Sequence, residues 1–337
     1  MLKRFIGLLV MLSLLLVGAA SYWVLRPLPL RQAVIDLSIE PHTSVRGIAK
    51  AAVEAGIEVD PQLLFLFFRL SGQSRALRAG SYEIHQGSNA VDVLRKLTRG
   101  EESLRAVSLI DGWTFKQFRN ALNKAEVLQH DTQGLSDEAI MAKLGMAGIP
   151  AEGRFFPDTY TYGKGTSDLR ILQRASNAMT KQLAAAWSQR APHLQVQTID
   201  EALILASIVE KETGRDSDRT TISSVFHNRL RIGMPLQTDP TVIYGLGDSF
   251  DGNLRRADLR TDHPWNTYTR KGLPPTPIAM PGKNALLAAV QPAHSTALYF
   301  VARGDGTSQF STTLEEHNAA VNRYQRGLKS PSTEEAK

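Results

Sequence analysis

Residues 198–214 read TIDEALILASIVEKETG, and this stretch decides how the larger part of the chain folds. Thr198, with Glu201 three residues later, forms a capping box, which predicts a helix starting directly after Thr198. Gly214 is a typical helix end. The sequence between them is apolar from Ala202 to Val209 apart from one serine. The helix is therefore predicted to be buried on nearly all sides.

Glu210 follows this apolar run directly. At helical spacing it stacks over Leu203, Ala206 and Ser207, so its carboxyl stands at the edge of an apolar helix. Loss of water there favours the protonated form, which a general acid needs. Spacing alone, however, favours a plainer role in which Glu210 pairs with a basic residue or caps a neighbouring helix.

A second carboxylate, Glu212, lies two residues further on and therefore about 200° around the helix. The two carboxylates of this helix cannot flank one glycosidic bond. A glycosidase with two acids would need its second acid elsewhere, and Asp239 in LQTDPT (236–241) is the nearest candidate. A turn role for Asp239 beside Pro240 is an equal alternative.

The composition is typical of a folded protein of moderate size. The chain has 337 residues, 42% of them hydrophobic and 21% charged, which is enough for a membrane segment and two modest domains. It has no cysteine, which excludes disulfides and thiolate chemistry. The net charge is +6, but Lys and Arg are interspersed with acids, so nucleic acid is not an expected partner. His227, His263 and His294 follow no metal-ligand spacing, and we expect no metal and no other cofactor.

The N-terminal part contains the strongest compositional feature. Residues 5–25 are uncharged and long enough to span a bilayer. A cleavable signal peptide is the alternative, because small residues at 18–20 resemble a cleavage site. The apolar run continues beyond them through Tyr22 and Trp23, an aromatic pair typical of a membrane interface. We therefore expect a retained transmembrane helix at 5–25 and a cytoplasmic N-terminus at 1–4.

A small α+β domain is predicted after a linker at 26–33, over residues 34–104. Its expected elements are a strand at 34–40, a helix capped by Thr43, an apolar helix at 63–70, a strand at 80–85 and a helix capped by Ser88.

The remainder, residues 105–328, is predicted to be a mixed α+β domain followed by a disordered tail at 329–337. Expected helices start after Thr114, Ser136 and Ser167, a hairpin spans 298–312, and a last helix starts at Leu314. The aromatic segment EGRFFPDTY (152–160) suits a core plug and a substrate groove equally. The loops HPWNTY (263–268) and GLPPTPI (272–278) suit sugar binding or a rigid structural role.

Several blocks of this sequence, in order, closely resemble the endolytic murein transglycosylase, or YceG-like, family. The matching blocks are ASIVEKET at 206–213, SVFHNRL at 224–230, LQTDPTVIYG at 236–245, Tyr268, GLPP at 272–275 and HN at 317–318. The resemblance covers nearly the whole chain, including the apolar N-terminal segment and a LysM-like subdomain at 34–104. It departs from the expected pattern at His263-Pro264-Trp265.

The resemblance implies a lytic transglycosylase at the bacterial inner membrane, with its catalytic domain in the periplasm. Glu210 matches the single acid and base that cleaves the bond between N-acetylmuramic acid (MurNAc) and N-acetylglucosamine (GlcNAc), leaving 1,6-anhydroMurNAc ends. The matching groove positions are Gln237, Asp239, Tyr244, Asn266 and Tyr268. Implied partners are nascent peptidoglycan strands, peptidoglycan synthases and the lipid of the inner membrane.

Two other functions stay open at this point. A muramidase would hydrolyse the same bond with Glu210 and Asp239. A noncatalytic scaffold would bind the cell wall through the LysM-like module alone.

Overall fold

A computed structural model describes residues 2–326, so the expected tail at 329–337 lies outside the described residues. The chain forms two compact units. The first contains residues 2–106, Glu126–Gln129 and Thr161–Thr166, and the second contains Val107–Ala125, His130–Tyr160 and residues 167–326. The chain therefore passes between the units after residues 106, 125, 129, 160 and 166. The sequence predicted only one such passage, after residue 104.

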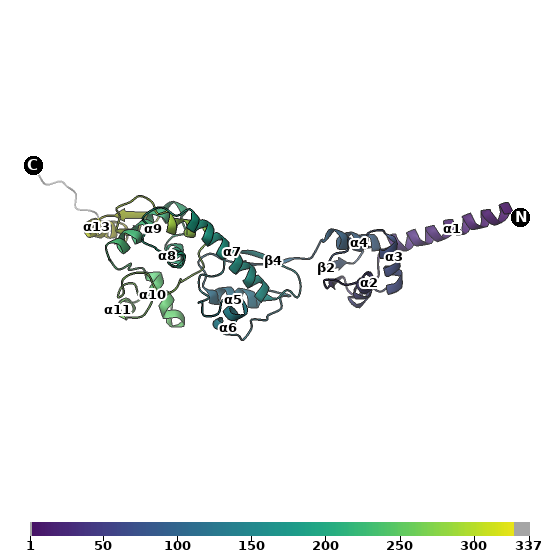
Figure 1. The fold of residues 1–337 in the computed structure, drawn as a ribbon, viewed down its shortest axis with the longest axis horizontal. Helices are drawn as coiled ribbons and strands as arrows, with labels where there is room; N and C mark the ends of the chain where they lie inside the picture. The colour runs from purple at the N-terminus through teal and green to yellow at the C-terminus, as the bar shows by residue number, and fades with distance from the viewer. Residues whose placement is uncertain (1, 327–337) are drawn as a thin grey trace, which may run out of the picture. The chain divides into compact units, whose positions relative to one another are not determined.

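The first unit begins with helix α1 (Leu2–Leu25), drawn in purple in Figure 1. Within the described residues it is the one helix long and apolar enough to cross a membrane, over Ile6–Leu25. The helix already begins at Leu2, within residues 1–4, which were expected to precede the membrane span.

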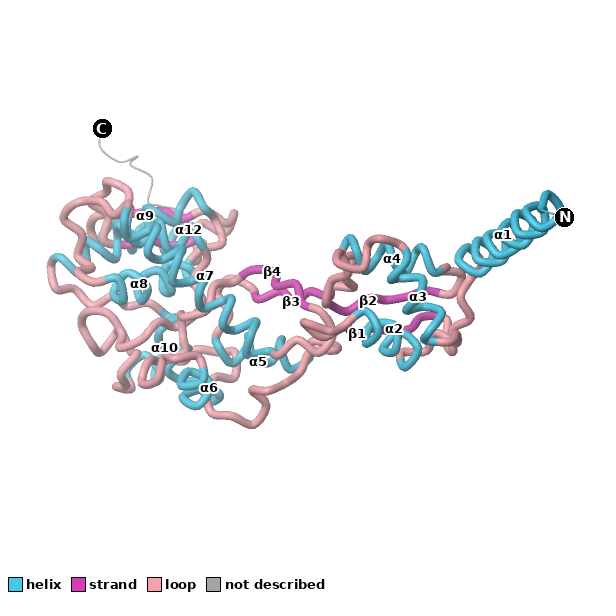
Figure 2. The backbone as a smooth tube through the Cα atoms, turned by 45° about the vertical axis from the view of Figure 1, so that its right-hand side comes forward, coloured by secondary structure: helices cyan, strands magenta, loops and turns pink. Residues whose placement is uncertain are grey.

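The rest of the first unit packs three helices onto a two-stranded sheet. Strand β1 (Val34–Ile39) pairs antiparallel with β2 (Gly80–His85), with Leu37 opposite Tyr82 (Figure 2). Alternate residues of β1 are buried, as a strand with one covered face requires. The helices are α2 (Val45–Glu54), α3 (Pro61–Leu70) and α4 (Ala90–Arg99).

The predicted caps of α2 and α4 are each wrong by one residue. Ser44, and not Thr43, accepts the N-terminal hydrogen bond of α2, from the Gly47 amide. Asn89, and not Ser88, forms a capping box with α4. Adjacent residues compete here because each has a side chain able to cap a helix.

A second two-stranded sheet was not expected. It pairs β3 (Arg105–Leu109) with β4 (Asp158–Tyr162), which takes in the end of the aromatic segment 152–160. The mixed α+β class is observed, with three separate two-stranded sheets among the described residues.

The second unit is built around α8 (Ile199–Glu212), which has the predicted capping box at Thr198. Helix α8 packs against α7, α9, α10 and α12. The helices of this unit are α5 (Phe115–Lys124), α6 (Asp137–Lys143), α7 (Asp168–Ser188), α8, α9 (Asp216–Arg231), α10 (Asp239–Leu246), α11 (Arg256–Arg260), α12 (Lys283–Val290) and α13 (Leu314–Tyr324), with a 3-10 turn at Gly247–Ser249.

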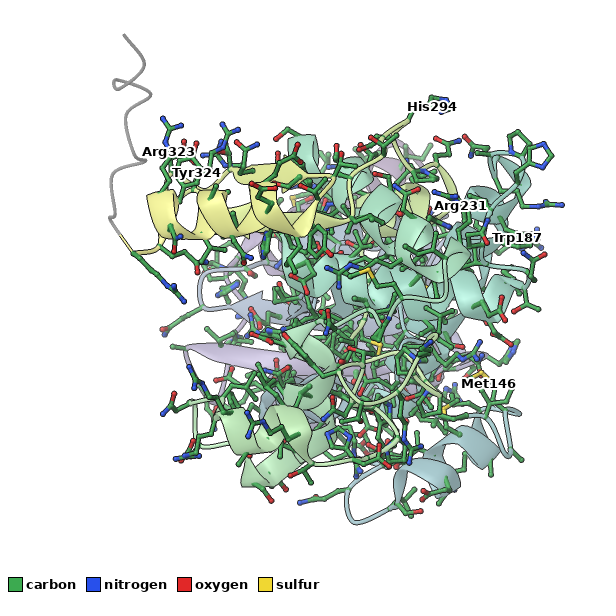
Figure 3. The ribbon with its side chains drawn as sticks, turned by 90° about the vertical axis from the view of Figure 1, so that its left-hand side faces the viewer. Met146, Trp187, Arg231, His294, Arg323 and Tyr324 are labelled. Carbon is green, nitrogen blue, oxygen red and sulfur yellow. The ribbon has the colours of Figure 1, made fainter. Side chains whose placement is uncertain are left out.

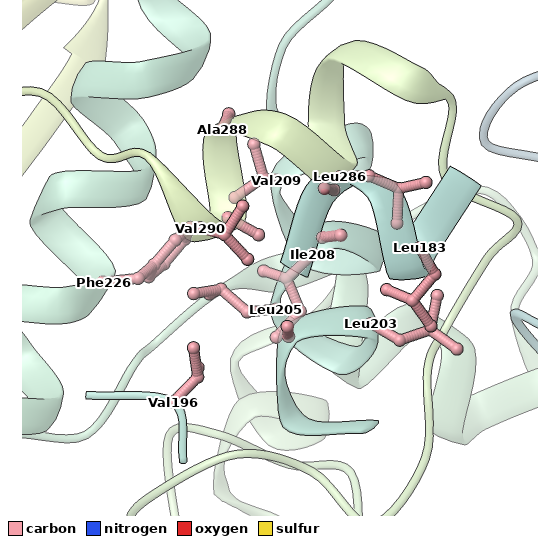
Figure 4. Close-up of a cluster of buried hydrophobic side chains, with 14 of the residues drawn as sticks. Leu183, Val196, Leu203, Leu205, Ile208, Val209, Phe226, Leu286, Ala288 and Val290 are labelled. Atoms are coloured by element: carbon pink, nitrogen blue, oxygen red, sulfur yellow. The ribbon is translucent and has the colours of Figure 1, made fainter. Parts of the chain in front are cut away.

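Figure 4 shows the apolar core around α8. Leu203, Leu205, Ile208 and Val209 project from α8 toward Leu183 of α7, Phe226 of α9, and Leu286 and Val290 of α12. Burial on several sides follows from the almost entirely apolar sequence of α8. This burial fixes the last turn of α8, which carries Glu210.

The predicted hairpin is present at the C-terminal end of this unit. Strand β5 (Tyr299–Ala302) pairs antiparallel with β6 (Ser308–Ser311), and α13 follows. Arg323 and Tyr324 lie on α13, the yellow helix of Figure 3, with the guanidinium 5.3 Å from the ring centre.

Candidate active site

Glu210 lies in the last turn of α8 with its side chain only 9% exposed. One carboxylate oxygen, Oε1, accepts a hydrogen bond from Arg219 Nη1 at 3.0 Å. The other, Oε2, accepts one from the backbone amide of Gly282 at 2.8 Å. Gly282 is the N-cap of α12, where the helix dipole favours a negative charge. Both oxygens are therefore fixed in position.

Arg219 is a buried cation that sequence reasoning missed. It comes from the first turns of α9, and its Nε also lies 3.3 Å from Asp216 Oδ1. A signal was present in the sequence, because Arg219 shares a helical stripe with the buried Ile222 and Phe226, at i+3 and i+7. The structure thus contains the pairing with a basic residue that spacing alone favoured for Glu210.

Asp111 brings a second carboxylate to the same place. Partial burial, followed by the charge of Glu210, raises the pKa of Asp111. Its carboxyl lies against Gly282, where an added Cβ would stand 2.6 Å from Asp111 Oδ1. Only glycine leaves room for this contact. Sequence gave no sign of it, because the two residues are far apart in the chain.

The loop that carries Asp111 is held by backbone hydrogen bonds. Gly112 donates to Met280 O at 2.8 Å, and Met280 donates to Trp113 O at 2.8 Å. Lys211 Nζ, from α8, donates to Gly112 O at 3.2 Å. These contacts join the loop, α8 and the residues before α12 into one wall of the site.

These groups line a pocket of about 280 Å³. Its lining residues are Asp111, Phe156, Pro157, Asp158, Glu210, Arg219, Gly282, Lys283 and Asn284. Small-molecule pockets start near this volume, so the pocket suits one part of a larger substrate. The mixture of carboxylates and cations suits a polar ligand and proton transfer.

The segment 152–160 lies partly in the core and partly at the wall of the pocket. Glu152 and Phe155 are buried, and the Phe155 ring stacks on Phe115 with centres 4.9 Å apart. Phe156, Pro157 and Asp158 line the pocket instead. Burial raises the pKa of Glu152 to about 8, although the Phe115 amide donates to its carboxyl at 3.1 Å.

Glu212 contacts a different part of the protein from Glu210, in agreement with the helical spacing. Its Oε1 accepts a hydrogen bond from the Thr238 hydroxyl. Burial is the main cause that raises the pKa of Glu212 to about 7, and the charge of Asp239 adds to it. Glu212 does not line the pocket around Glu210.

Three of the residues named for the groove gather near Glu212. Tyr268 donates its hydroxyl to Asp239 Oδ1 at 2.5 Å, where Asp239 opens helix α10. Gln237 has a left-handed backbone with φ of 50°, and its amide donates to Thr267 O at 3.1 Å. The side chains of Gln237 and Asp239 are exposed.

Tyr244 lies elsewhere, with its ring 5.7 Å from that of Trp265 and its hydroxyl hydrogen-bonded to Glu152. Burial is the main cause that raises the pKa of Tyr244. None of the five groove residues lines the pocket around Glu210.

Asn266 is fully buried. Its side-chain amide donates to the carbonyls of Asp258, Leu259 and Thr261, at 3.2, 3.2 and 2.7 Å, and its Oδ1 accepts from the Tyr268 amide at 2.9 Å. Asn266 thus anchors the loop at 263–268 to the end of α11.

Comparison with known proteins identifies the relatives of this chain. The family model for the YceG-like family matches residues 37–323. A protein of Bacillus subtilis strain 168 named endolytic murein transglycosylase is 29% identical over 314 residues, which cover 87% of this chain and 85% of that protein. A protein of the same name from Streptococcus pneumoniae serotype 2 is 28% identical, over 85% of this chain and 58% of that protein.

A solved structure is similar as well. The 2.6 Å crystal structure of a YceG-like protein from Listeria monocytogenes superposes with a TM-score of 0.54 and 28% sequence identity. The superposition covers 85% of this chain and 98% of that chain. The similarity therefore extends well beyond the residues of the pocket.

Proposed function

Since the chain belongs to the YceG-like family, we propose that it is an endolytic murein transglycosylase that cleaves peptidoglycan strands, with Glu210 as its catalytic residue. The observation that carries this proposal is the position of Glu210. It is the one carboxylate of α8 that lines the pocket, and both of its oxygens are oriented by fixed donors.

The proposed reaction needs one acid that also acts as a base. Protonated Glu210 donates its proton to the oxygen between MurNAc and GlcNAc, and the bond to MurNAc C1 breaks. The resulting carboxylate then takes the proton of the MurNAc C6 hydroxyl, whose oxygen bonds to C1. The product is a 1,6-anhydroMurNAc end, and no water is consumed.

The surroundings of Glu210 support the second half of this sequence. Arg219 and the Gly282 amide both stabilise a carboxylate, which is the form that Glu210 takes after the first proton transfer. Gln237, Asp239, Tyr244 and Tyr268 are proposed as contacts for sugars further along the strand.

The proposed membrane location is based on the length and apolar composition of α1. We propose α1 as a single-pass anchor in the bacterial inner membrane, with the residues after α1 in the periplasm. The packing of Trp23 on Phe67, with ring centres 6.4 Å apart, supports retention of this helix. Cleavage near Ala20 would remove the helix that positions Trp23.

Anchoring would restrict cleavage to strands beside the membrane, where they are synthesised. On this basis we propose peptidoglycan synthases as partners and termination of glycan elongation as the biological role. The small α+β domain at 34–104 is proposed to be LysM-like.

The test uses purified sacculi and the Glu210→Gln variant. Wild-type protein should release fragments with anhydro ends, and Glu210→Gln should release none while still unfolding in one cooperative thermal transition. Glu315→Gln, which changes an exposed carboxylate on α13, is the matched control and should keep full activity. Binding to sacculi without release of fragments by the wild type would assign the scaffold function instead.

Asp111 gives a specific reason to test a hydrolytic alternative. It lines the same pocket as Glu210, whereas Asp239 bonds to Tyr268 and does not line it. A muramidase would thus use Asp111 as its second acid. Hydrolysis leaves ends heavier by one water than anhydro ends, so mass spectrometry of the fragments decides between the reactions.

A further inference from the structure

Helix α3, with the sequence PQLLFLFFRL, has apolar residues on its outer side as well as its inner side. Leu64 and Phe68 are buried in the core of the first unit. Leu63, Leu66 and Leu70 are 45%, 50% and 75% exposed, respectively, and they follow helical spacing at i, i+3 and i+7. A continuous apolar stripe of this kind on a small domain indicates an interaction surface.

The exposed stripe adjoins the C-terminal end of α1. Ala20, Trp23 and Val24 of α1 line one apolar groove together with Leu63, Leu66 and Leu70 of α3. The Trp23 ring also contacts the Phe67 ring edge-on. Within the first unit, α3 lies beside the base of α1 in Figures 1 and 2.

The length of α1 determines how deep in the bilayer this groove would lie. The apolar stretch Ile6–Leu25 has 20 residues, and at about 1.5 Å per residue it is just long enough for a hydrocarbon core of about 30 Å. If the bilayer ended before Ala20, the remaining residues would span only about 21 Å. A hydrocarbon core of this average thickness places Ala20 and Val24 within the bilayer, and with them the α3 side chains that line the same groove.

We infer that α3 is a membrane-docking helix, whose outer stripe of Leu63, Leu66 and Leu70 lies in the lipid of the leaflet where α1 leaves the bilayer. This inference rests on the proposed role of α1 as an anchor. It adds a second point of contact, which fixes the orientation of the small domain against the membrane.

The charges near the stripe suit a lipid surface. Helix α3 contains no acidic residue, and Arg69 is its one charged residue. Arg26 directly follows α1, and both arginines are exposed. Guanidinium groups next to an apolar stripe pair with phosphates of lipid headgroups while the leucines enter the acyl region.

The absence of cysteine from the chain makes the test direct. Single cysteines are introduced into the full-length protein by Leu66→Cys or Leu70→Cys and labelled with a nitroxide. The labelled proteins are reconstituted in vesicles of phosphatidylethanolamine and phosphatidylglycerol. Electron paramagnetic resonance then compares collisions with oxygen, which concentrates in lipid, and with a water-soluble nickel chelate.

Two further labels serve as references. Leu15→Cys lies in the middle of α1 and reports whether α1 crosses the bilayer. Glu101 is exposed and follows the C-terminal end of α4. The other end of α4 is the one near α1, because Asn89 there pairs with Pro27. A label introduced by Glu101→Cys therefore reports an aqueous environment.

Lipid docking predicts that labels at 66 and 70 collide preferentially with oxygen, as the label at 15 does, and that the label at 101 prefers the nickel chelate. Water-like behaviour at 66 and 70 with a buried label at 15 would overturn the docking while leaving the anchor intact. Dipolar broadening at 66 that disappears on dilution with unlabelled protein would show that a second copy covers the stripe, which also overturns it. A water-exposed label at 15 would overturn both the anchor and the docking.

The reconstituted vesicles contain no other membrane protein, so apart from a second copy of this chain only lipid can cover the stripe. As a second measurement, the label is placed by Leu63→Cys in a Leu66→Glu, Leu70→Glu background. Both glutamates replace exposed residues, so the domain should stay folded. The preference of the label for oxygen should then reverse, and an unchanged preference would contradict the docking.

Discussion

Arg219 Nη1 lies 3.0 Å from Glu210 Oε1, and each of the two side chains is only 9% exposed. Removing one partner of such a buried pair leaves the other charge without compensation. Arg219→Met should therefore destabilise the second unit by about 3 kcal/mol and reduce cleavage of sacculi. Chemical denaturation of the detergent-solubilised protein measures the first effect, and fragment release measures the second.

The same pair predicts strong coupling between the two positions. In Arg219→Met, the additional change Glu210→Gln removes the uncompensated charge and should restore much of the lost stability, although not activity. Additive losses of stability in the double variant would show that the pair contributes little.

Gly282→Ala should reduce both activity and stability. The added methyl would stand 2.6 Å from Asp111 Oδ1, so the Asp111 loop or the start of α12 has to move, and with it the amide that orients Glu210. Gly214→Ala is the matched control, because no heavy atom lies within 4 Å of its added Cβ. Combining Gly282→Ala with Asp111→Ala removes the clash and should recover the lost stability. If the combination unfolds as readily as the single variant, this explanation is wrong.

The stability of the protein should depend on pH through Glu212. Burial raises its pKa from 4.5 to about 7 in the folded protein, so the folded state binds this proton more tightly than the unfolded state. The contribution is fully present below about pH 4.5 and is lost as the pH rises to about 7. Glu212→Gln removes this dependence and should be more stable than the wild type at pH 8.

Melting temperatures of both proteins between pH 4 and 8 check this prediction. The contribution of Glu152, whose pKa is raised to about 8, is common to both proteins and cancels in the comparison. Glu315→Gln, at an exposed position, should follow the wild-type curve. Parallel curves for wild type and Glu212→Gln would contradict the raised pKa.

Asn266→Ala should loosen the C-terminal end of α11 and the loop that follows it, because the carbonyls of Asp258, Leu259 and Thr261 lose their donor. Each lost hydrogen bond typically costs about 1 kcal/mol. Limited proteolysis should cut the variant within this loop sooner than the wild type. An unchanged digestion pattern with weaker binding to sacculi would instead favour direct contact of Asn266 with substrate.

Much of the fold was predictable because local patterns encode it. The capping boxes at Thr114 and Thr198 and the strand and hairpin at 80–85 and 298–312 are local signals, and the structure confirms them. Strands β3 and β4 were missed, because each is short and their pairing depends on a partner about fifty residues away. For Asp239 the sequence favoured a turn beside Pro240 and a second acid equally. The structure places Asp239 at the start of α10, where proline is well suited to the first turn of a helix.

The residues of the candidate site also divide into those that local sequence predicts and those that depend on distant contacts. Glu210 was accessible to sequence reasoning, because it follows an apolar run within one helix. Asp111 and Gly282 were not, since their contacts join distant parts of the chain. Arg219 was partly predictable, because helical spacing places this cation on the same stripe as buried apolar residues. The proposed groove residues rest on family resemblance, and the structure brings only some of them together.

The repeated passage of the chain between its two units affects how the protein can be dissected. Residues 126–129 and 161–166 belong to the first unit, where Lys164 bonds to Asp36 at 2.6 Å and accepts from Ser81 through its carbonyl. A protein shortened to its first 106 residues lacks these pieces, and one that begins at residue 107 carries them without their partners. A protease that cuts once between the units cannot free either of them. Neither unit can therefore be obtained intact as one continuous fragment of the chain.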